Sequence, residues 1–207
     1  MERKCLIMEL AKLAKHGITK DTPSNIPFGA GTWFKNLVYD AENGWTGTVL
    51  GATSGGSSIK ITSEVKDVEI DGALAAAKGL ALMTGGAGEA EVNFAELNAD
   101  ILKLTTLGEI LDENSEHYVE GFDCIQTKNA IVEGDYVQNL GFVGYTADQS
   151  KQIIVILDNA LCKSGFQFDP KNKENTVVKA TFTAYGDIDS DLDKVPIRIY
   201  YPSTQAA

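Results

Sequence analysis

A short acidic run near the C-terminus is the feature of the sequence most suggestive of chemistry. In DIDSDLD (187–193) four aspartates alternate, as ligands do at the start of a calcium-binding loop. The glycine that such a loop needs is replaced by Leu192, and Arg198 stands where the bidentate glutamate belongs. We therefore interpret the run as a solvated acidic turn, with weak surface binding of calcium as the alternative.

Two glycine-rich stretches resemble nucleotide-binding loops only in part. GATSGGSS (51–58) spaces two glycines as a phosphate-binding loop does, but Ser57 occupies the lysine position and no alternating α/β pattern surrounds it. We predict a turn between strands there. MTGGAGEA (83–90) lacks the third glycine of a dinucleotide fingerprint and does not open a helix, which predicts a hairpin tip or loop. Neither stretch predicts a cofactor site.

Histidine and cysteine are too few and too scattered to form a recognisable catalytic or metal centre. The chain has two histidines, His16 and His117, and three cysteines, Cys5, Cys124 and Cys162. His117 and Cys124 are seven residues apart, which is not a zinc-ligand spacing. A Cys–His nucleophile pair formed in space is the alternative, although an isolated cysteine in a strand-like run is usually a packing residue. The sequence thus predicts no catalytic, cofactor-binding or metal-binding residue and no enzyme.

The charge of the chain is strongly acidic and unevenly distributed. The net charge is −11 over 207 residues, although residues 1–20 carry five Lys and Arg against two Glu. Such a body repels DNA, because sequence-independent DNA binding needs Lys and Arg to replace counterions. No apolar run approaches the ~18 residues of a membrane helix, and the odd number of cysteines favours a reducing compartment. The length suits one domain with extended arms.

Most of the chain after residue 31 alternates with period two, which predicts antiparallel strands. The strand-like segments are rich in Val, Ile, Thr, Tyr and Phe, and Gly, Asn and Asp interrupt them at short intervals. They cover 32–39, 47–52, 58–70, 89–94, 135–146, 151–157, 176–185 and 196–201. We predict a mainly β fold, in which two packed antiparallel sheets form a sandwich or barrel flanked by one α-helix.

The flanking helix is predicted over residues 97–108, where apolar residues recur at helical spacing. Asn98 is placed to cap its N-terminus, with Leu97 and Leu102 at the staple positions on either side of the cap. Gly108 is placed to end it in a left-handed conformation.

The N-terminal region has a different composition. Residues 5–17 predict a short amphipathic helix, with Met8 as an alternative start of the native chain, and residues 18–31 predict an arm that holds two prolines and two glycines. We therefore divide the chain into an N-terminal helix and arm over 1–31, a β-sandwich domain over 32–202 and a C-terminal tail over 203–207.

Eight short segments follow one another in a recognisable order along the β region. They are GATSGG (51–56), EVKDVEIDGA (64–73), KGLAL (78–82), the helix after EVNFAEL (91–97), HYVEGFD (117–123), VILDNAL (155–161), VKATFTAYGDID (178–189) and PIRIYYP (196–202). This succession resembles the major tail tube proteins of long-tailed, non-contractile phages and related prophages. The resemblance covers roughly residues 22–202, and it depends on order and spacing because no single motif is diagnostic.

The resemblance implies a structural virion protein. Six subunits would form a ring whose inward sheets join into a β-barrel around a lumen, and rings would stack into a hollow tail through loops and terminal arms. The implied partners are copies of the chain itself, a tape-measure protein, and tail tip, baseplate and tail terminator proteins. Double-stranded DNA would pass through the lumen without specific binding, and no membrane is involved. The implied location is the virion tail, after assembly in the host bacterial cytoplasm.

Two alternative functions remain open from the sequence. One is the tube subunit of a contractile tail or phage-like bacteriocin. The other is a β-sandwich module that binds carbohydrate or a receptor. The second would expect a cluster of aromatic residues on the surface, and Trp33 and Trp45 are the only tryptophans.

Overall fold

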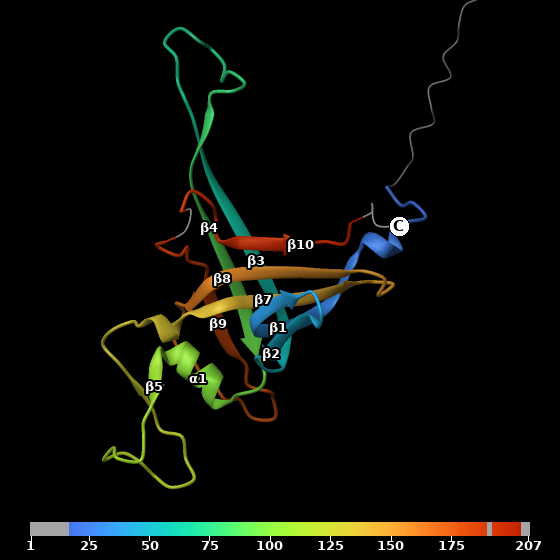
Figure 1. Ribbon diagram of the computed structural model, residues 1–207. Coiled ribbons are helices and arrows are strands. Elements are labelled where there is room, and N and C mark those ends of the chain that lie inside the picture. The colour runs from blue at the N-terminus through green and yellow to red at the C-terminus, as the bar shows by residue number, and fades with distance from the viewer. Residues whose placement is uncertain (1–16, 190–191, 204–207) are drawn as a thin grey trace, which may run out of the picture.

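The computed structural model describes residues 17–189 and 192–203, so nearly all of the predicted helix over 5–17 lies outside the described residues. The fold is mainly β with one α-helix, as predicted (Figure 1). The strands are β1 (Pro27–Asp40), β2 (Gly44–Val49), β3 (Thr53–Asp67), β4 (Ala81–Phe94), β5 (Gly108–Ile110), β6 (Ile125–Thr127), β7 (Val137–Thr146), β8 (Gln152–Cys162), β9 (Val178–Thr183) and β10 (Ile197–Tyr200). The helices are α1 (Ala99–Thr106) and the short 3-10 turns η1 (Pro23–Asn25) and η2 (Glu133–Asp135).

Strand β8 joins two antiparallel sheets into one continuous structure. The strand order is β2-β1-β7-β8-β9-β4-β3, with β10 also paired to β8, and β5 and β6 form a separate pair. The first part of β8 pairs with β7 and β10, whereas its last two residues, Leu161 and Cys162, pair with β9. We call β2, β1, β7, β8 and β10 sheet A, and β8, β9, β4 and β3 sheet B. The two sheets pack face to face, which confirms the predicted fold class.

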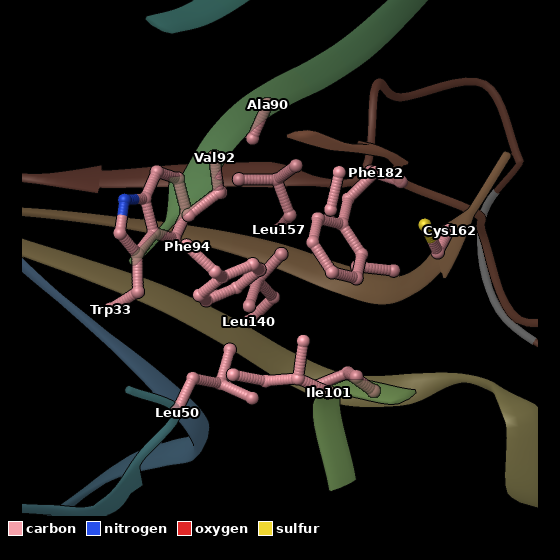
Figure 2. Packing of buried hydrophobic residues seen from close by; sticks show 14 of the residues in the cluster. Trp33, Leu50, Ala90, Val92, Phe94, Ile101, Leu140, Leu157, Cys162 and Phe182 are labelled. Atoms are coloured by element: carbon pink, nitrogen blue, oxygen red, sulfur yellow. The ribbon is translucent and has the colours of Figure 1, made fainter. Parts of the chain in front are cut away.

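The main core fills the space between sheets A and B (Figure 2). Alternate residues of β4 point inward, with Ala90, Val92 and Phe94 all buried. Trp33 of β1 is completely buried, and its indole Nε1 donates a hydrogen bond of 3.0 Å to Ser57 Oγ on β3. Because β1 and β3 lie near opposite ends of the strand order, this bond helps to close the sandwich. Burial of each large side chain contributes about 1.5–3 kcal/mol.

Two asparagines in left-handed conformation reverse the inward–outward alternation of their strands. Asn36 in β1 has φ 56° and Asn159 in β8 has φ 44°. Trp33 and Leu37 would face the same way in a regular strand, yet Trp33 is in the main core and Leu37 is in a second cluster on the outer face of sheet A. After Asn159, Ala160 still pairs with Val137 of β7, and Leu161 and Cys162 then pair with β9. Asparagine tolerates this backbone conformation better than most residues.

Helix α1 begins as the sequence predicts but ends differently. The Asn98 side chain accepts a hydrogen bond of 2.8 Å from the Ile101 amide, which confirms the predicted cap. The helix stops before Gly108, as predicted, but the left-handed residue at its C-terminus is Leu107, with φ 50°, and not the glycine. Gly108 instead begins β5, where a Cβ atom would lie 2.8 Å from the Gln126 carbonyl oxygen. The absence of a side chain at Gly108 therefore permits the close approach of β5 and β6.

The first glycine-rich stretch, 51–58, connects two strands only at Gly51 and Ala52, between β2 and β3, so the predicted turn is confined to its first two residues. The second stretch lies within a strand, so the tip or loop predicted at 83–90 was wrong. Residues 53–58 belong to β3, with Gly55 and Gly56 at an irregularity of its pairing with β4. Residues 83–90 belong to β4, and a Cβ at Gly88 would lie 2.0 Å from the Ile197 side chain. Small residues in β4 leave room for side chains of the β10 region. Turn preferences of the local sequence cannot predict this packing between distant segments.

Strand β1 begins at Pro27, inside the predicted arm. Its pairing with β7 shifts between Phe28 and Thr32, where Gly29 and Gly31 both have positive φ. The glycines that predict an arm therefore form an irregular stretch of β1, where it pairs with β7. A Cβ at Gly31 would also collide with the Phe142 ring at 2.3 Å.

Candidate functional site

The outer part of the β3–β4 hairpin projects from the body into solvent (Figure 1). We call residues 60–84 the arm, which is a different segment from the arm predicted over 18–31. Every residue in it except Leu80 is exposed. The arm nevertheless carries large apolar side chains on its strands and its tip. These are Ile61, Val65, Val68, Ile70, Leu74, Leu82 and Met83. A two-stranded ribbon is marginally stable alone, and exposed apolar surface of this extent marks an interaction site.

The outer face of sheet B is polar. Cross-strand pairs set Lys60 of β3 beside Glu89 of β4, and Glu91 of β4 beside Thr181 of β9. The Lys179 ammonium lies 2.9 Å from a carboxylate oxygen of Glu91. We call this surface the polar face; it consists of Ser58, Lys60, Glu89, Glu91, Lys179, Thr181 and Thr183. Because this face consists of charged and hydroxyl side chains, it forms no apolar patch.

The outer face of sheet A is apolar by contrast. Leu37, Ile154 and Ile156 are buried there, and Phe34 and Trp45 pack against them. Trp45 continues this cluster to the surface, with its ring centroid 4.8 Å from that of Tyr200 and 5.3 Å from that of Tyr39. A cavity of about 430 Å³ opens beside these rings. Of the two tryptophans, Trp33 is thus a core residue and Trp45 belongs to a surface aromatic cluster.

Strand edges offer a further surface for association. β2 and β3 lie at the two ends of the strand order, and β3 is 15 residues long. The outer backbone amide and carbonyl groups of a terminal strand are a template for pairing with another chain. The arm is part of this edge, because β3 runs through it as far as Asp67.

A second projection lies at the opposite end of the molecule from the arm (Figure 1). Strands β5 and β6 pair and carry the loop 111–124 between them. The segment 108–127 contains six Asp and Glu and no Lys or Arg. Both strands are only three residues long, so period-two alternation could not reveal them. The acidic composition was the signal that could have identified this projection.

The residues that suggest chemistry in the sequence lie in a turn near the C-terminus, in the loop 111–124 and at the end of β8. Asp187 accepts a hydrogen bond of 3.1 Å from the Asp189 amide in a turn, as expected for an acidic turn. Within 17–189 and 192–203, no group of three or more His, Cys, Asp or Glu side chains gathers as metal ligands. His117 is exposed and lies 3.4 Å from Glu116. Burial raises the pKa of the Cys162 thiol, which disfavours the reactive thiolate.

No helix among the described residues is both long and apolar enough to cross a membrane. No protein-family model matches the sequence, and a search of curated proteins finds no match. Among solved structures, the chain is similar to one titled "Virion of native gene transfer agent (GTA) particle". The identity is 10%, the TM-score is 0.39, and the match covers 85% of this chain and 98% of that chain.

Proposed function

We propose that the protein is the major tube subunit of a non-contractile phage tail, with a structural role and no enzymatic one. The observation that carries the proposal is the arm, whose apolar side chains have no cover in the single chain. The ordered segments over 51–202 that resemble tail tube proteins supply the specific class. The long edge of β3 supplies a second surface that association would satisfy.

The arm suits a contact between successive rings. It extends from one end of the molecule and presents apolar residues that a neighbour's surface can bury, at about 25 cal/mol per Å² of apolar area. A contact between two different surfaces of identical subunits generates a filament when its rotation does not close into a ring, as in a stacking contact. Pairing between strand edges around a ring does close. Together the two contacts would produce stacked rings, six subunits to each ring in the implied tail tube.

The polar face of sheet B is the surface we assign to the lumen. It combines Glu89 and Glu91 with Lys60 and Lys179 among hydroxyl groups, so its formal charges balance. A wall with no surplus of Lys or Arg cannot replace the counterions of DNA, so that DNA passes without sticking. Replacing Glu89 and Glu91 by lysine should slow genome ejection from particles whose tails still assemble. Unchanged ejection would remove the lumen assignment.

The remaining partners follow from the same proposal. A tape-measure protein would set the tube length, a tip or baseplate would nucleate it, and a terminator would close it. The protein would therefore be found in the virion tail after assembly in the host cytoplasm.

Electron microscopy of negatively stained, concentrated protein tests the proposal. We expect hollow tubes or six-membered rings from the natural sequence. The double variant Val65→Asp/Met83→Asp places two charges on paired positions of the arm and should abolish tubes, because burial of a carboxylate in an apolar contact is costly.

The variant Val65→Ile/Met83→Leu is the matched control, since it keeps an apolar surface at the same positions and should assemble normally. Circular dichroism of both variants should show an unchanged fold. A chain that stays monomeric at every concentration, even with its tail tip complex and tape measure, would contradict the proposal.

A further inference from the structure

A large open cavity is lined by residues of strands β1, β7 and β8 and of the segments 131–136 and 185–189. Its volume is about 1020 Å³. Three side-chain amides and two tyrosine rings line it, and we call it the amide cavity: Asn36, Gln138, Asn159, Tyr136 and Tyr185. The tail tube proposal uses none of these residues.

The three amides come from three adjacent strands, β1, β7 and β8. Val137 pairs with Ala160 and Asn139 with Asp158, which sets Gln138 directly opposite Asn159. Asn36 and Asn159 are the two left-handed residues that reverse the alternation of their strands. Irregular strand positions of this kind re-aim side chains, and they are common beside binding sites. Here both irregularities lead to the same cavity.

The amides retain hydrogen-bonding capacity toward a ligand. Within the described part of the chain, the side chains of Asn36 and Gln138 have no hydrogen-bond partner. The Asn159 amide donates to the Tyr185 carbonyl oxygen at 3.3 Å, which orients it in the cavity wall. Each side-chain amide offers two donors and a carbonyl acceptor. Such groups can match hydroxyls, which also both donate and accept.

The tyrosines supply the apolar surface of the cavity. The rings of Tyr136 and Tyr185 meet edge to face at 5.6 Å between centroids. The Lys163 ammonium lies 5.2 Å from the Tyr185 centroid, on the same ring. Both tyrosines are half-buried, so that part of each ring is available for contact. Aromatic walls combined with a few convergent polar groups are typical of small-molecule sites.

We propose that the amide cavity binds a neutral carbohydrate. A sugar ring has an apolar C–H face that can lie on tyrosine and a rim of hydroxyls that amides can bind in both directions. The carboxylates of Glu133, Asp187 and Asp189 also line the cavity and accept hydrogen bonds from hydroxyls. A cationic peptide would bind mainly to these exposed carboxylates and would make little use of the side-chain amides and tyrosine rings. The sugar uses every class of group present.

A glycan array tests the proposal, printed with neutral oligosaccharides of glucose, galactose, mannose, rhamnose and N-acetylglucosamine. The best hit is then titrated by calorimetry against the full chain at about 0.05 and about 0.5 M salt. We expect saturable binding that changes little with salt. Asn36→Gly and Gln138→Ala should each weaken it roughly tenfold or more, because each leaves sugar hydroxyls unpaired. Glycine preserves the left-handed backbone at position 36, so the first variant should still fold.

Gln152→Ala is the matched control, because Gln152 is an exposed strand glutamine that lines the other cavity, beside Trp45. The affinity of the Gln152→Ala variant for the sugar should equal that of the natural sequence. No binding to the array, or binding that Asn36→Gly and Gln138→Ala leave unchanged, would overturn the proposal. Binding of a hexa-arginine peptide in place of sugar, with loss at high salt, would also overturn it.

Discussion

The two halves of the β3–β4 hairpin both carry large apolar residues but have opposite surroundings. Near the body, Val92 and Phe94 of β4 are completely or almost completely buried in the main core. Farther out on the same strand, Leu82 and Met83 are more than half exposed. Large apolar residues thus continue well beyond the part of the hairpin that the chain itself covers. The difference indicates that the inner half stabilises the fold, whereas the outer half is available for another copy.

Truncation of one side chain in each half gives the largest expected contrast in stability. Phe94→Ala should lower the free energy of unfolding by about 3–5 kcal/mol, because it opens a cavity in the main core. Leu82→Ala should change it by less than about 0.5 kcal/mol in the monomer, because no body residue covers the side chain. Urea titration of the two monomeric variants measures both values. Equal losses would show that the arm is part of the folded core and would break the contrast.

Two glycines of β4, Gly88 near the body and Gly85 beside the base of the arm, give a smaller contrast in stability. A Cβ at Gly88 would meet the Ile197 side chain at 2.0 and 2.5 Å, so Gly88→Ala should cost about 1–3 kcal/mol through overpacking. At Gly85 the nearest atoms belong to the flexible Glu64 side chain, and Gly85→Ala should stay within about 0.5 kcal/mol. Thermal unfolding of the monomers compares them. A tolerated alanine at Gly88 would indicate that the β10 region does not pack tightly on β4.

Local patterns were sufficient to predict the fold class and several of its details. The cap at Asn98 depends on residues next to it in sequence, and the alternation of Ala90, Val92 and Phe94 needs only a sheet with one covered face. These features follow from helix-end and strand geometry alone. These features depend only on residues that are close together in the sequence.

The rest depended on contacts between distant segments. The glycine-rich strand at 83–90 was predicted as a hairpin tip or loop, and Gly88 is explained only by Ile197, more than a hundred residues later. The amide cavity likewise gathers Asn36, Gln138 and Asn159 from three strands, and the left-handed conformations that bring them together leave no mark on composition. No spacing rule could have grouped these residues.

Hydrogen exchange measured by mass spectrometry tests the central claim, that the arm becomes buried when subunits associate. Backbone amides of residues 60–84 should exchange rapidly in the monomer, while those of 89–94 are already protected. In assembled protein the arm should gain strong protection and the inner residues should change little. An arm that exchanges equally fast in the monomer and in the polymer would contradict the account.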